Sequence, residues 1–145
     1  MDAALAHLAA ACAYAGFQWT VRVVVYPQLA TVGHSDPWGF AAYAVAHQRR
    51  VTWLVGPLFA ALVATSALLV LTRASSLLAW ACAAATLVVL GATWLGAVPQ
   101  HRVLAAGWDA PAHRRLLRAD DVRVAASSAQ VVCALLVATS RAPSG

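Results

Sequence analysis

Four long apolar stretches are the feature of this sequence that most restricts its fold. They comprise residues 5–26, 51–71, 77–98 and 122–138. Each is close to the ~20 residues that an α-helix needs to cross ~30 Å of hydrocarbon. Transmembrane strands would show ~10-residue segments of alternating hydrophobicity, and none of the stretches alternates. We therefore predict that residues 1–145 form a single all-α domain, an integral membrane four-helix bundle.

The distribution of charge supports a membrane protein and predicts its orientation. Charged residues make up 10% of the chain, whereas soluble domains carry about 25%. Only Arg73 and Arg141 lie near the second connection and the C-terminus. The other arginines flank the first and third connections, and they are Arg22, Arg49, Arg50, Arg102, Arg114, Arg115, Arg118 and Arg123. The positive-inside rule then places these two connections in the cytoplasm and both termini outside the cell membrane. This interpretation gives nucleic acid no role as a partner.

Proline, glycine and aspartate residues recur at corresponding positions in the two halves of the sequence. Pro27-Gln28 follows the first apolar stretch and Pro99-Gln100 follows the third, and residues 33–37 and 107–111 both contain Gly, Asp and Pro. The pattern predicts a parallel pseudo-two-fold repeat of two helix hairpins. Chance is the alternative, because these residues are common in loops.

The connections also contain signals for the start of a helix. Asp36 followed by Pro37 is typical of a capped first turn, so we expect a helix from Pro37 into the second stretch. The last helix is predicted to begin near Pro111 and to run unbroken to about Ala138.

Polar residues inside the apolar stretches recur at helical spacing. An ionised group at mid-bilayer costs ~2.5–3.5 kcal/mol on insertion scales, so such residues are expected to face the bundle interior. One face of the first helix carries His7, Tyr14, Gln18 and Arg22, and one face of the last carries His113, Asp120, Arg123, Ser127 and Gln130.

These faces predict a polar pocket at the cytoplasmic ends of the helices. The candidate catalytic residues are His47, His101 and Asp120. The candidate substrate-binding residues are Gln18, Arg22, Arg50, Arg123 and Gln130. In the alternative interpretation the arginines extend to lipid phosphates, Asp120 and Arg123 form a local ion pair, and Gln130 joins helices by hydrogen bonds.

No familiar catalytic or nucleotide-binding motif occurs in the sequence, and we expect no cofactor. A metal held by His47, His101 and Asp120 is the alternative, although these residues lack the i, i+4 spacing of a helical metal site.

Three segments together resemble a known family. They are Gln18–Arg22 with Tyr26-Pro27, Tyr43–Arg50 with Gly56-Pro57, and Val98–His101 followed by Gly107–Asp109 and Arg123. Their order and spacing resemble the small four-span membrane proteins of the anthrone oxygenase-like family. That family has Val-Pro and a polar residue after the third span, then Asn-Trp shortly before an arginine. Pro99, His101 and Arg123 match, whereas Asp120-Asp121 stands where the family has Asn-Trp.

The resemblance implies a tailoring oxygenase of secondary metabolism, which oxidises a lipophilic polycyclic aromatic (anthrone-like) substrate with dioxygen and no cofactor. His47 or His101 would act as base, and Arg22, Arg50 or Arg123 would hold the oxyanion. A second hypothesis is a membrane cyclase in which Asp120 protonates an isoprenoid substrate.

A third hypothesis is a non-catalytic protein for lipid binding, transport or assembly. The expected partners are membrane lipids and a lipophilic small molecule. The sequence leaves open whether the chain forms a homo-oligomer.

Overall fold

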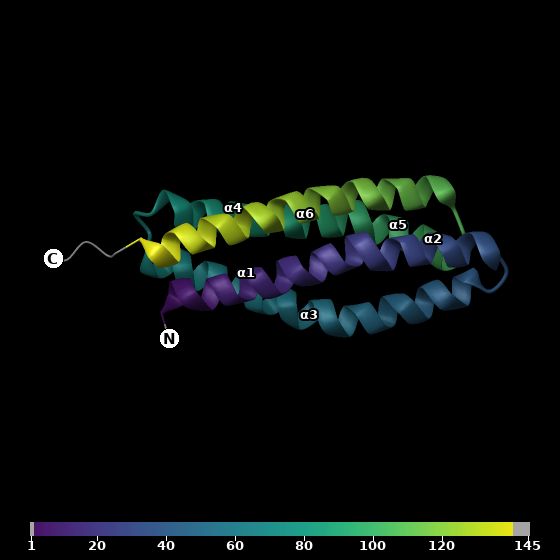
Figure 1. Ribbon diagram of the computed structural model, residues 1–145, viewed down its shortest axis with the longest axis horizontal. Coiled ribbons are helices and arrows are strands. Elements are labelled where there is room, and N and C mark those ends of the chain that lie inside the picture. Colours follow the sequence, from purple (N-terminus) through teal and green to yellow (C-terminus); the bar gives the residue numbers. More distant parts are fainter. Residues whose placement is uncertain (1, 141–145) are drawn as a thin grey trace.

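The computed structural model describes residues 2–140 as four long helical rods (Figure 1). The first rod comprises α1 (Ala3–Thr20), the π-helical segment η1 (Val21–Val25) and α2 (Tyr26–Ser35). The second is α3 (Phe40–Thr72), the third comprises α4 (Leu77–Gly91), the π-helical segment η2 (Ala92–Ala97) and α5 (Val98–Ala106), and the fourth is α6 (Ala110–Thr139). All four rods are long and apolar enough to cross a membrane. The predicted all-α four-helix bundle is confirmed.

Short polar side chains cap the helix starts. The Asp109 carboxylate accepts a hydrogen bond from the Ala112 N–H at 2.5 Å, and the Ser76 hydroxyl oxygen accepts one from the Ala79 N–H at 3.3 Å. Such caps satisfy N–H groups that have no partner within the helix. The helix α6 then continues without a break to Thr139, as the sequence predicted.

The start of α3 differs slightly from the prediction. Asp36 accepts a hydrogen bond from the Gly39 N–H at 2.9 Å, as a capping residue does. However, residues 37–39 form a turn, and the helix begins at Phe40 rather than at Pro37. Gly39 is the N-cap of α3 and no side chain caps it, so Asp36 closes the preceding turn instead, and both the predicted cap and the predicted first helical residue are wrong.

A π-helical segment precedes a proline in both hairpins. The Tyr26 N–H donates to the Val21 carbonyl just before Pro27, and the Val98 N–H donates to the Thr93 carbonyl just before Pro99. Proline has no N–H to donate and crowds the preceding turn, so a wider turn lets the helix continue past it. Because a π-helical turn before a proline occurs in each hairpin, the structure supports the predicted repeat of two helix hairpins.

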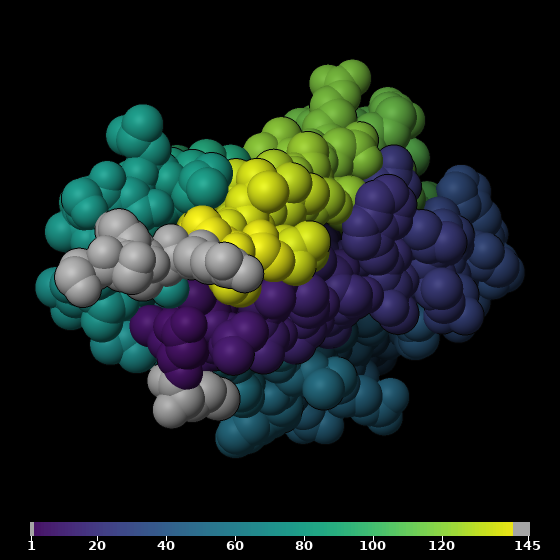
Figure 2. Space-filling view, turned by 60° about the vertical axis from the view of Figure 1, so that its left-hand side comes forward, coloured from purple at the N-terminus to yellow at the C-terminus, as the bar shows by residue number. Residues whose placement is uncertain are grey.

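The rods pack so that α6 contacts both α1 and α4, while α1 also contacts α3. Figure 2 shows α1, in purple, against the end of α6, in yellow. The start of α1, the end of α6 and the connection at residues 73–76 lie at one end of the bundle, and the other two connections lie at the opposite end (Figure 1). Large apolar side chains, including Leu71, Leu77 and Leu95, are exposed around the bundle. An apolar exterior of this kind is what a membrane protein presents to lipid.

Trp108 closes the end of the bundle that carries the two longer connections. Its ring lies edge-on to the rings of His34 and Phe40, with centroids 4.9 and 5.1 Å away. A Cβ atom on Gly33 would lie only 2.2 Å from a carbon of the indole ring. A glycine at residue 33 is therefore needed for the indole to lie against α2.

We predict that Gly33→Ala lowers the free energy of unfolding by about 1–3 kcal/mol, because the added methyl must displace Trp108. The measurement is thermal unfolding in detergent micelles. Gly16→Ala is the matched control: a Cβ there meets nothing within 4 Å, and alanine should stabilise the helix by up to about 1 kcal/mol. Equal effects of the two substitutions would contradict this account.

Candidate functional site

A buried ion pair lies on the inner face of α6. The Asp120 carboxylate is 0% exposed and the Arg123 residue 6% exposed, and an Arg123 Nη2 to Asp120 Oδ1 distance of 2.6 Å joins them. Gln18 on α1 donates a hydrogen bond from its side-chain amide to the same carboxylate oxygen. An isolated carboxylate in apolar surroundings is strongly unfavourable, so the guanidinium and the amide are what make the burial of Asp120 tolerable.

Two tyrosines extend this network to α1 and α2. The Tyr14 hydroxyl donates to the Gln18 side-chain oxygen at 3.1 Å, and Arg123 donates to the Tyr26 hydroxyl oxygen at 2.9 Å. Among the described side chains, one buried N–H remains without a partner, that of Arg123 Nε, as do two buried oxygens, Asp120 Oδ2 and Gln130 Oε1. Such a group is costly unless a ligand or water meets it.

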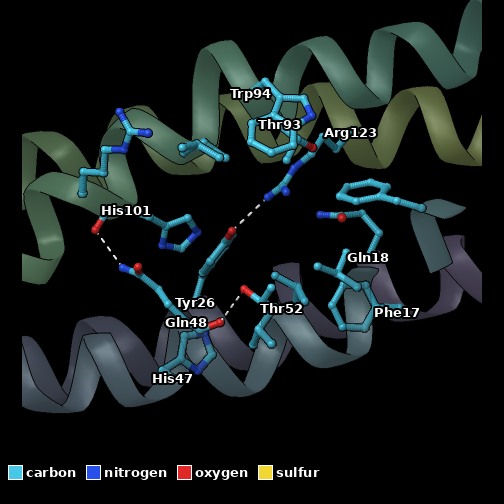
Figure 3. Close-up of a pocket in the computed structure, with 17 residues that line it drawn as sticks. Phe17, Gln18, Tyr26, His47, Gln48, Thr52, Thr93, Trp94, His101 and Arg123 are labelled. Carbon is cyan, nitrogen blue, oxygen red and sulfur yellow. Dashed lines mark hydrogen bonds between the residues drawn. The ribbon is translucent and has the colours of Figure 1, made fainter. Parts of the chain in front are cut away.

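A cavity of about 330 Å³ lies beside this network. Its lining comes from all four rods and includes both segments next to the prolines (Figure 3). The residues that line it are Phe17, Gln18, Val21, Tyr26, His47, Gln48, Val51, Thr52, Val55, Phe59, Thr93, Trp94, Ala97, Val98, His101, Arg102 and Arg123.

Both candidate histidines contribute to this one cavity. His47 belongs to α3 and His101 to α5, and the Gln48 side chain donates a hydrogen bond to the His101 carbonyl at 2.7 Å, which joins the two helices. The rings of His101 and Tyr26 have centroids 6.2 Å apart. In Figure 3, Tyr26 lies between His101 and Arg123. The structure therefore brings together four of the predicted site residues: Gln18, His47, His101 and Arg123.

The cavity opens through the side of the bundle. Trp94 in η2 is 63% exposed and Thr52 in α3 is also exposed, yet both line the cavity. Side chains that face both the cavity and the exterior mark its mouth. Part of this mouth lies between two apolar rods, at α3 and η2.

Other predicted site residues lie outside the cavity lining. Asp120 is behind Arg123 and reaches the cavity only through it. Arg22 pairs with Asp121 at 2.6 Å, beside a second, more open hollow on the α1–α6 flank. Arg50 is exposed and does not line the cavity.

Gln130 belongs to a second buried network nearer the chain ends. It donates to the Thr86 hydroxyl at 2.7 Å and lies 3.3 Å from His7 Nε2, while His7 Nδ1 lies 3.1 Å from the Thr65 hydroxyl. These bonds join α1, α3, α4 and α6. Gln130 thus connects helices, as the alternative interpretation of the sequence expected, and does not line the cavity.

Five polar residues of the cavity were absent from the predicted set: Tyr26, Gln48, Thr52, Thr93 and Arg102. In a regular helix Tyr26 would point about 80° away from Gln18, since each residue turns about 100°. The wider turn of η1 brings it back to the inner face. Pro27 is the one local signal that could have predicted this change of phase.

The donor groups of the cavity favour proton transfer and anion binding. Two imidazoles supply ring nitrogens that can accept or donate a proton, and a guanidinium can hold an oxyanion. Among residues 2–140, no three His, Cys, Asp or Glu side chains lie together so that they could hold a metal ion. Comparisons with protein-family models, with curated proteins and with solved structures found no match to this chain.

We predict that Arg123→Met lowers the free energy of unfolding by about 3–5 kcal/mol, because it leaves the Asp120 carboxylate buried without a cation. Replacing both partners, as in Asp120→Asn with Arg123→Met, should cost less than the single change. Thermal unfolding in detergent compares the three proteins. A single variant as stable as the unmodified protein would show that the pair does not stabilise the fold.

Proposed function

We propose that this protein is a small membrane enzyme, a tailoring oxygenase that acts on a lipophilic polycyclic aromatic (anthrone-like) substrate. The observation that carries the proposal is the side-opening cavity in which His101 and His47 lie near the Tyr26–Arg123 pair. Its volume of about 330 Å³ falls within the roughly 300–1,000 Å³ of small-molecule sites. A lipophilic substrate dissolved in the bilayer would enter between Thr52 and Trp94.

The proposed reaction begins with removal of a proton. His101 takes it from the methylene carbon opposite the substrate carbonyl, and the negative charge moves to the carbonyl oxygen. The guanidinium of Arg123, which lines the cavity, donates a hydrogen bond to that oxygen and stabilises the anion. Dioxygen then oxidises the anion directly: a carbon–oxygen bond forms, the resulting peroxide loses water, and the methylene becomes a second carbonyl. One O₂ is consumed and one H₂O is formed for each substrate.

In this proposal Asp120 is a positioning residue. It fixes the guanidinium of Arg123 through the 2.6 Å contact and does not touch the substrate. The cyclase hypothesis needs Asp120 to protonate an alkene. Its complete burial and its pairing with Arg123 favour the oxygenase instead.

The proposed orientation follows from the arginines. Six exposed arginines lie near the end of the bundle with the two longer connections: Arg49, Arg50, Arg102, Arg114, Arg115 and Arg118. We place that end in the cytoplasm and both chain termini outside the cell membrane. The cavity then opens into the cytoplasmic leaflet.

We expect His101→Ala to reduce turnover by about 10²–10⁴-fold, because the base is lost. The assay uses the full chain in lipid nanodiscs with an anthrone, and it follows quinone absorbance together with oxygen consumption. His47→Ala tests the second imidazole in the same way. If the true base is His47, the larger loss will appear in that variant.

His34→Ala is the matched control, since His34 is exposed and lies outside the cavity lining. Its activity per folded molecule should equal that of the unmodified protein. Absence of anthrone-dependent oxygen consumption in the unmodified protein would reject the oxygenase. Tight anthrone binding without turnover would favour the non-catalytic lipid-binding hypothesis.

The orientation predicts a labelling pattern in intact cells. In a background without Cys12, Cys82 and Cys133, a membrane-impermeant maleimide should label Ala74→Cys but not Ser35→Cys, because the two exposed positions lie at opposite ends of the bundle. Labelling of both variants after lysis controls for accessibility. The reverse pattern would move the cavity to the outer leaflet.

A further inference from the structure

The cavity carries positive charge that its own surroundings do not balance. Its lining contains two guanidinium groups, those of Arg123 and Arg102, and none of the residues that line it is an aspartate or glutamate. Asp120 neutralises Arg123 from behind. The ion pairs between residues 2 and 140 involve Arg22, Arg73 and Arg123, and Arg102 takes part in none of them.

The two guanidinium groups belong to opposite ends of the cavity. In Figure 3, Thr93 and Trp94 lie beside Arg123, whereas His101 lies at the other end. Arg102 follows His101 in α5, nine residues after Thr93, and nine residues of helix rise about 13 Å. Arg102 is exposed at that end. Most of the remaining lining is apolar, including Phe17, Val51 and Phe59 among others.

We infer that the substrate is an amphipathic acid, with a carboxylate held by Arg102 at one end and its reacting carbonyl held by Arg123 at the other. The inference rests on the proposed function and specifies its substrate class. A guanidinium binds a carboxylate through two parallel, charge-assisted hydrogen bonds. An aromatic body spans the apolar wall between the two anchors, which fixes the methylene carbon beside His101.

A matched pair of ligands tests the inference: an anthrone with a ring carboxylate, and its methyl ester. The two differ in charge and little in shape. Both are assayed for binding, by quenching of tryptophan fluorescence, and for turnover, with the full chain in phosphatidylcholine nanodiscs. We expect the acid to have a Kd and a KM at least tenfold lower than the ester.

Variants at Arg102 test whether this residue causes the preference for the acid over the ester. Arg102→Gln should reduce the tenfold preference toward one, and Arg102→Lys should retain part of it because the charge remains. Arg114→Gln is the matched control, since Arg114 is exposed on α6 and outside the cavity lining. It should keep the full preference.

The outcomes separate this inference from the proposed function. Equal binding of acid and ester by the unmodified protein overturns the inference even if both are oxidised. Arg102-dependent binding of the acid without oxygen consumption supports the inference and rejects the oxygenase. Arg102→Gln could also leave the preference for the acid over the ester unchanged, with binding of the acid depending on the content of anionic lipid instead. That result would assign Arg102 to lipid phosphate and overturn the inference.

Discussion

The cost of burying a charge inside an apolar bundle is the constraint on which the rest of this structure depends. Asp120 and Arg123 lie where water cannot solvate them, and each is tolerated because the other is 2.6 Å away. The pair needs further hydrogen bonds, which Gln18 and Tyr26 provide from the first rod. Those bonds hold α1 and α2 against α6. The position of the cavity wall that these helices form therefore depends on the Asp120–Arg123 ion pair.

The two π-helical segments explain why a cavity exists beside this pair. A regular helix through residues 18–26 would turn Tyr26 away from Arg123, whereas η1 turns it inward. In the other hairpin η2 places Thr93, Trp94 and Ala97 on the opposite wall. Widened turns interrupt the regular meshing of side chains between helices. The prolines that follow these two segments therefore contribute to the presence of the cavity as well as to the local geometry of the helices.

The second polar network has a different consequence for the bundle. His7, Thr65, Thr86 and Gln130 bond to one another across four helices and occupy the interior near the chain ends. Hydrogen bonds between helices fix their rotation and register in surroundings where apolar packing alone is not specific. Such bonds join the helices in this half of the bundle, while the other half contains the cavity that opens through the side. The polar residues on one face of each helix thus contribute both to the packing of the helices and to the candidate site.

The sequence by itself determined the four rods, the start of the last helix near Pro111, and the inward faces of the first and last helices. These follow from local rules: hydrocarbon thickness sets helix length, and the cost of buried charge sets which face turns inward. The tertiary structure alone decided how the polar residues divide, with His47, His101 and Arg123 in the cavity, Gln130 in the second network, and Arg22 paired with Asp121 on the flank. A period of 3.6 residues cannot reveal this division. It depends on the phase change in η1 and on which partner from another helix lies close enough to bond.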